Sequence, residues 1–129
     1  MTIKWIGAVT VIGSVFAAGV AVGQQNAASR REPQFENSEV MVWKSIVMPK
    51  QPLSLHRHDH GRALISLNGG TLNVVDGNGK VIDVYKLEAG KAMWLDADKP
   101  GTQHADVNPG KTDVEVVVVQ LKNDKPLVK

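Results

Sequence analysis

The stretch His56-Arg57-His58-Asp59-His60-Gly61-Arg62 decides the fold prediction, because it contains three of the four histidines of the chain. If residues 53–58 form a β-strand, its two-residue period places the side chains of His56 and His58 on one face. The fourth histidine, His104, lies 46 residues after His58, in another predicted strand. Two histidines on one strand and a third on another can bind one metal ion through three nitrogens. The alternative interpretation of the His-x-His pair is a solvated strand end.

The sequence around these histidines is typical of an all-β domain. From Glu39 onward the apolar segments alternate or are β-branched, and Gly, Pro, Asn or Asp bounds each of them. We predict strands at residues 40–47, 53–58, 63–67, 71–75, 81–86, 92–95, 102–107 and 114–121. Residues 76–79 predict a tight hairpin. Residues 116–119 are apolar on both faces, which favours a covered strand over a dimer edge. Short strands at this spacing predict a closed barrel or jelly roll.

The histidine spacing resembles the two motifs of the cupin superfamily. The first motif is Gly, five residues, His-x-His, three or four residues, Glu, six residues, Gly. His56 and His58 match it, and Gly69 or Gly70 stands at the fitting distance. The resemblance covers roughly residues 39–122 and implies a small single-domain cupin, folded as a double-stranded β-helix.

The second cupin motif is Gly, five residues, Pro-x-Gly, two residues, His, three residues, Asn. Gly101, His104 and Asn108 match it. The resemblance thus implies a metal bound by His56, His58 and His104. Asn108 is expected to hold the loop after His104 through its side chain.

The chain departs from both motifs. Lys50 and Met93 stand where the motifs begin with Gly, and Pro100 is one position late. The larger departure is the motif glutamate, whose place is taken by Arg62 or Ala63, depending on the spacing. An arginine cannot coordinate a cation, and its charge opposes one. The fourth ligand is therefore water, a nearby group such as His60 or an Asp, or there is no metal.

Three side chains are candidates for contacts with a substrate: Arg62, His60 and Trp94. Arg62 either caps the barrel rim or binds a substrate carboxylate with its planar fork. His60 lies past the predicted strand end, where solvation is expected more than ligation. Trp94 is expected to line the core or a pocket. Inward positions in the predicted strands are expected to bury the large apolar residues Leu55, Leu64, Val74 and Trp94.

Composition excludes several functional classes. A chain of 129 residues is long enough for one domain. The net charge of +2 is spread through the chain and aromatic residues make up 5%, so nucleic acid is not expected as a partner. The absence of cysteine excludes disulfides, thiolate nucleophiles and Cys-based metal sites. The sequence contains neither a Gly-rich phosphate loop before a helix nor a Gly-x-Ser-x-Gly elbow.

The first 23 residues predict export. Residues 5–22 carry no charge and end at Ala21-Val22-Gly23, with small residues where a signal peptidase cuts. The alternative is an uncleaved membrane anchor, since about 20 apolar residues span a bilayer. Residues 24–38 are polar and aperiodic and predict a linker, and residues 123–129 predict a C-terminal tail. The expected location is the periplasm or the exterior, or the inner membrane if the leader is uncleaved.

Together these observations predict an exported small cupin that binds one divalent transition metal (Fe, Mn, Zn or Ni) and a small polar or anionic ligand. If the protein is an enzyme, metal-dependent dioxygenation is favoured, because neutral imidazoles with open coordination positions suit Fe(II). The alternative is a non-enzymatic binding or accessory protein without metal. A homodimer is compatible with the sequence. Metal affinity is expected to fall as the pH drops through roughly 6.5, the ordinary histidine value.

Overall fold

The computed structural model describes residues 28–125, so the predicted leader and residues 126–129 of the predicted tail lie outside the described residues. Within this range the chain forms strands and no helix, and therefore no described helix is long and apolar enough to cross a membrane. The strands are β1 (Arg30–Glu36), β2 (Val40–Val47), β3 (Arg62–Ser66), β4 (Gly70–Val75), β5 (Val81–Leu87), β6 (Ala92–Leu95), β7 (Ala105–Val107) and β8 (Val114–Leu121).

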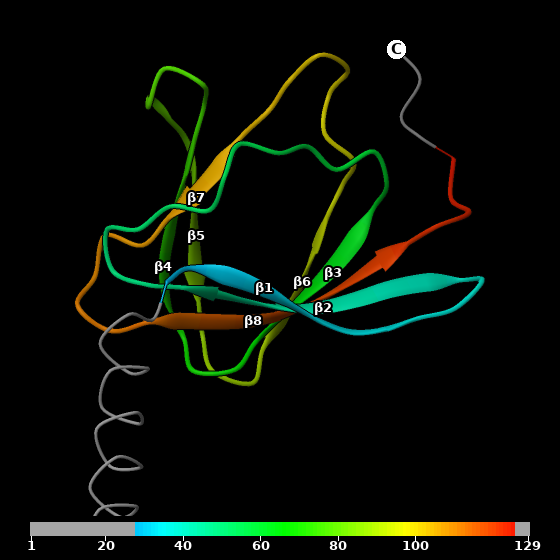
Figure 1. Cartoon of the computed structure of the whole chain (residues 1–129), viewed down its shortest axis with the longest axis horizontal. Coiled ribbons are helices and arrows are strands. Elements are labelled where there is room, and N and C mark those ends of the chain that lie inside the picture. The colour runs from blue at the N-terminus through cyan, green and yellow to red at the C-terminus, as the bar shows by residue number, and fades with distance from the viewer. Residues whose placement is uncertain (1–27, 126–129) are drawn as a thin grey trace, which may run out of the picture.

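The strands form two antiparallel sheets. One has the order β1-β2-β8-β3-β6 and the other the order β5-β4-β7. Figure 1 shows β4, β5 and β7 grouped at the left, and β3 and β6 to the right of them. The order places the last strand, β8, between β2 and β3, so the barrel joins distant parts of the chain.

The core lies between the two sheets. Alternating residues of β8 point inward, and Val114, Val116 and Val118 are buried there. They pack with Trp43, Val47 and Leu64 from the same sheet and with Leu72 from β4. Residues 116–119 are therefore buried on the inner face alone, half-buried on the outer face, and paired with β2 and β3 on the two edges. Burial of large apolar side chains on facing sheets supplies the main driving force for this packing.

Most of the predicted strands are confirmed, but residues 53–58 are not a strand. They form an extended loop whose only ladder contact is an isolated antiparallel bridge between His56 and His104. The strand predicted at 102–107 begins later, at Ala105. The hairpin at 76–79 is confirmed, with Asp76 accepting hydrogen bonds from the backbone of Asn78 and Lys80.

The predicted linker at 24–38 is wrong for residues 30–36, which form β1. This strand pairs with β2 alone, at the edge of the five-stranded sheet. Its sequence lacks alternation and contains Pro33, which an edge strand tolerates because one side of the strand makes no ladder. The register shifts between Pro33 and Phe35, as in a β-bulge. Pairing with β2, rather than apolar burial, explains why this segment is ordered as a strand.

Of the four apolar residues expected to be buried, Leu64 and Val74 are, with 6% and 3% of their surface exposed. The prediction is wrong for Leu55 and Trp94, which are 46% and 53% exposed. Leu55 lies in the loop that replaces the expected strand. Trp94 pairs with Ala63 on the outer face of its sheet, because its neighbours Met93 and Leu95 take the inward positions of β6.

Candidate metal centre and adjoining cavity

Backbone pairing brings His56 and His104 together. The amide of His56 donates to the carbonyl of His104 over 2.9 Å, and the amide of His104 donates to the carbonyl of His56 over 2.8 Å. This mutual pair fixes the two residues opposite each other, and their ring centroids lie 4.5 Å apart. Residues 53–58 and 102–107 are thus joined by this one bridge rather than as two full strands.

His58 joins the pair through the loop before His104. Its amide donates to a carboxylate oxygen of Asp98 over 2.7 Å, and the amide of Asp98 donates to its carbonyl over 2.8 Å. Its ring centroid lies 4.9 Å from that of His56 and 5.5 Å from that of His104. The ring also stacks in parallel with the indole of Trp43, at 5.9 Å between centroids. The structure therefore brings together the three predicted ligands, with one ring nitrogen of each within 4.8 Å of the others.

The Nδ1 atom of each imidazole faces an oxygen acceptor. The acceptors are the Ser54 carbonyl for His56 at 2.7 Å, the Gln120 side-chain oxygen for His58 at 2.9 Å and the Asp98 carboxylate for His104 at 3.3 Å. A carbonyl or carboxylate oxygen can only accept, so Nδ1 carries the proton and Nε2 carries a free lone pair. This is the arrangement that outer hydrogen bonds give to metal-binding histidines.

The donor set fits a metal ion. His56 Nε2 is buried and is the one buried side-chain polar atom of residues 28–125 without a hydrogen-bond partner. Such an atom costs free energy unless a ligand satisfies it. The nearest charged group is Asp106, with a carboxylate oxygen 3.8 Å from this nitrogen. The orphaned nitrogen and the three converging rings are what a divalent cation with imidazole ligands requires.

Burial favours the neutral, metal-binding form of His56 and His58. It lowers the pKa of His56, and burial together with the positive charge of Arg62 lowers the pKa of His58 to about 3. Burial opposes ionisation of Asp98, but hydrogen bonds from His104 and from the His58 amide outweigh it and hold the Asp98 pKa at about 2. We therefore expect His56 and His58 to be protonated only below the ordinary histidine value of roughly 6.5.

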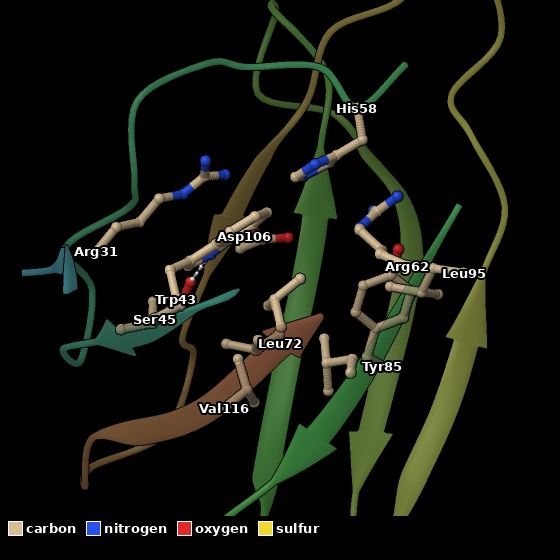
Figure 2. A pocket seen from close by; sticks show the side chains of 13 residues that line it. Arg31, Trp43, Ser45, His58, Arg62, Leu72, Tyr85, Leu95, Asp106 and Val116 are labelled. Atoms are coloured by element: carbon tan, nitrogen blue, oxygen red, sulfur yellow. Dashed lines mark hydrogen bonds between the residues drawn. The ribbon is translucent and has the colours of Figure 1, made fainter. Parts of the chain in front are cut away.

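A small cavity lies beside His58, inside the barrel. Figure 2 shows Arg31 and Trp43 on one side of it and Arg62, Tyr85 and Leu95 on the other. Apolar side chains of the core form its floor. Arg62 points into the barrel from β3 and is only 4% exposed, so it does not cap the rim. Burial lowers its pKa from the usual arginine value and, despite the Arg62 charge, raises the pKa of Tyr85 to about 12.

Two of the predicted substrate contacts lie outside this cavity. The Nδ1 of His60 is 2.7 Å from the Asp124 carboxylate, and His60 does not belong to the histidine cluster. Trp94 lies on the outer face of the sheet, and its Nε1 donates to Asp96 over 2.9 Å. Asn108 behaves as predicted, since its buried side chain binds Val47, Gly110 and Thr112 and closes the turn.

Sequence reasoning missed Arg31 and Asp106, which both line the cavity. Arg31 was assigned to the linker, and its segment carries no apolar alternation that would have revealed a strand. Asp106 pairs with Val74 on the inward face of β4, and alternation with the flanking Ala105 and Val107 could have revealed it.

Of the comparisons with known proteins, the one with solved structures identifies the fold. No family model matches the sequence, and no curated protein is significantly similar to it. A cupin domain from Bordetella pertussis is 22% identical, with a TM-score of 0.63 over 74% of this chain and 94% of that one. A conserved protein with a double-stranded β-helix domain from Klebsiella pneumoniae is 26% identical, with a TM-score of 0.55 over 74% and 78%.

A third solved structure, an RmlC-like cupin family protein from Methanocaldococcus jannaschii, has the double-stranded β-helix fold. It is 14% identical, with a TM-score of 0.56 over 74% of this chain and 83% of that one. The chain is therefore a small protein of the cupin fold.

Proposed function

We propose that this protein binds one divalent transition metal ion through the Nε2 atoms of His56, His58 and His104. The observation that supports this most directly is the buried, unpartnered Nε2 of His56. Oriented Nδ1 hydrogen bonds on all three rings add to it, because they direct three lone pairs inward. Fe, Mn, Zn and Ni all accept imidazole ligands, so the donor set does not distinguish among them.

Three histidine ligands leave coordination positions open for a small polar or anionic ligand. When bound, a redox-active metal such as iron would supply oxygenation chemistry, which makes metal-dependent dioxygenation the enzymatic class that we propose. The chain's own groups would orient the ligand: Arg62 would hold an anionic end, and the apolar core side chains would exclude water. His60 and Trp94, as the structure places them, would contribute only near the outer loops.

Metal analysis of protein purified without a His tag tests the proposal. We expect one equivalent of a divalent metal, and isothermal titration of the stripped protein should show one site. His56→Ala, His58→Ala and His104→Ala should each abolish tight binding. His60→Ala is the matched control, since this histidine contacts Asp124 instead, and it should bind like the wild type. Absence of metal uptake at neutral pH, with the fold intact, would refute the metal site.

The second candidate is a non-enzymatic small-molecule binding protein without metal. Arg62 favours it, because a buried guanidinium takes the place of the carboxylate expected from the cupin resemblance. Its positive charge also opposes a cation near His58. A folded, untagged protein that takes up no metal but binds small anions would establish this function in place of the first.

We also propose that the protein is exported and that the mature chain begins near Gln24. The support is the uncharged run at residues 5–22 and the small residues Ala21 and Gly23 before the proposed cleavage site. Mass spectrometry of the native protein should find an N-terminus at or near residue 24 in the periplasm or medium. An intact Met1 on membrane-bound protein would show an anchor instead.

A further inference from the structure

Arg62 carries hydrogen-bond donors that the described residues do not use. Its side chain is buried, with 4% of the residue exposed, yet its guanidinium makes a single hydrogen bond within residues 28–125, from Nη1 to the Asp96 carbonyl over 3.1 Å. No carboxylate of these residues forms an ion pair with it. A guanidinium has five N–H donors, and the Arg62 nitrogens without a hydrogen bond keep some accessible surface, because His56 Nε2 is the one fully buried unpartnered side-chain atom of residues 28–125. Arg62 lines the cavity, so its unused donors are available to a ligand that enters it.

Arg31 provides a second guanidinium on the opposite side of the cavity. It pairs with Ser45 across the β1–β2 ladder, which directs it to the same side of the sheet as the inward-facing Trp43. The centre of the guanidinium lies 4.8 Å from the centroid of the Trp43 ring, in a cation–π contact. Figure 2 shows the ends of Arg31 and Arg62 on the two sides of one space. Two cationic groups thus flank a cavity whose floor is apolar.

We propose that this cavity binds the carboxylate group of a short-chain organic acid, with the planar fork of Arg62 as its main partner. Arginine matches the two oxygens of a carboxylate with two parallel hydrogen bonds. The Tyr85 hydroxyl lines the same space, and its raised pKa keeps its proton available for donation. Arg31 adds positive charge from the mouth of the cavity.

The lining favours a carboxylate over a phosphate or sulfate. Those anions present oxygens on every side, whereas Leu64, Leu72 and Val116 offer no donor. Asp106, in the wall, would repel a dianion more strongly than a monoanion.

The cavity also limits the length of the acid. The centres of water molecules can occupy about 20 Å³ of it, which is room for only one or two of them. A ligand of at most two or three carbons is therefore expected, with its carboxylate taking the place of these water molecules at Arg62.

This inference rests on the proposed function, because it names the class of small ligand held beside the metal. The contacts between the carboxylate and Arg62 do not require the metal. Acetate binding to the full chain, stripped with EDTA, tests it. Trp43 lines the cavity and serves as the fluorescent reporter. Trp5→Phe and Trp94→Phe together remove the other two indoles of the chain, and Trp94 does not line the cavity. We expect a saturable change in Trp43 fluorescence with acetate and propionate, and much weaker effects from phosphate and from the bulkier benzoate.

Variants at the two arginines complete the test. Arg62→Met should weaken acetate binding at least tenfold, and Arg62→Lys, which keeps the charge but not the fork, should also weaken it. Arg31→Met should weaken binding severalfold. Arg30→Met is the matched control, because Arg30 pairs with Glu32 and is exposed. Its acetate binding should equal that of the parent.

Specific outcomes would overturn the carboxylate site. These are no saturable acetate signal in folded protein, equal binding by phosphate, or unchanged binding by folded Arg62→Lys and Arg31→Met. Circular dichroism establishes folding of each variant. If Arg62→Met does not fold, Arg62→Lys, which keeps a buried positive charge, serves as the test in its place. A protein that binds acetate but no metal would refute the metal site alone, and one that binds metal but no acetate would refute the carboxylate site alone.

Discussion

The Nε2 atom of His56 faces a carboxylate oxygen of Asp106 across 3.8 Å. Since His56 donates from Nδ1 to Ser54, both facing atoms are electron-pair donors, and the distance is too long for a hydrogen bond. A cation bound by the three histidines would be attracted by this carboxylate. Asp106 does not belong to the group of ligand atoms that lie within 4.8 Å of one another, so we expect it to act on the histidine cluster as a neighbouring negative charge.

Asp106→Asn is expected to lower metal affinity by roughly ten- to a hundredfold, the range seen when a group next to a metal ligand is removed. The amide preserves the shape of the side chain but not its charge. Isothermal titration with Zn²⁺ or Mn²⁺ measures the change. Asp83→Asn, on exposed β5, is the control and should leave the affinity unchanged. Equal affinities for Asp106→Asn and the wild type would show that the carboxylate plays no part in metal binding.

Acid is expected to destabilise the metal-free protein well above pH 3. The folded-state pKa of His58, about 3, lies below the ordinary value of 6.5, so the unfolded chain takes up a proton that the folded chain does not. Stability is then fully present above pH 6.5 and is lost as the pH falls toward 3. One such proton corresponds to about 1.4 kcal/mol per pH unit. Lowering of the His56 pKa acts in the same direction.

Urea unfolding of EDTA-treated protein between pH 7 and 4 measures this dependence. His58→Gln removes one titrating group and should reduce the slope of unfolding free energy against pH by about one proton. If His58→Gln leaves the slope of unfolding free energy against pH unchanged, His58 is not the group whose pKa is lowered by folding.

Leu64→Ala should cost about 2 to 5 kcal/mol of unfolding free energy, because Leu64 belongs to the buried core between the sheets. Leu55→Ala is the matched control: Leu55 is 46% exposed, and its truncation should change stability by less than about 0.5 kcal/mol. Urea titration compares the two. A larger loss for Leu55→Ala than for Leu64→Ala would contradict the placement of the histidine loop outside the core.

Lys50→Gly is expected to stabilise the protein by up to about 1 kcal/mol. Lys50 has a φ of +58°, which puts an L side chain in the left-handed region, and it stands where the first cupin motif has Gly. Glycine relieves that strain, although it also raises the entropy of the unfolded chain. Lys86→Gly, in β5, is the control and should destabilise instead. A fall in the unfolding midpoint of Lys50→Gly would show that the Lys50 side chain contributes more than its backbone conformation costs.

The histidine cluster could be predicted from the sequence because alternation holds locally even without a full strand. His56 and His58 lie in an irregular loop, yet their rings are adjacent, as a two-residue period requires. Trp94 was misplaced because β6 offers three consecutive large apolar residues, and alternation alone does not say which of them face inward. Arg31 could not be found, since the pairing that orders its strand is supplied by β2 and leaves no pattern within residues 30–36.

The position of β8 has a consequence for how the site assembles. This strand is the last of the described chain, yet it lies between β2 and β3, and its Gln120 accepts the hydrogen bond that orients His58. Closing such long loops costs entropy before their contacts form, so folding of this topology is slow relative to chains with local contacts. A nascent chain on the ribosome has all four histidines before it has β8, and they are not yet held in place. If the histidines bind a metal, we expect binding only after β8, which ends at Leu121, has joined the sheet.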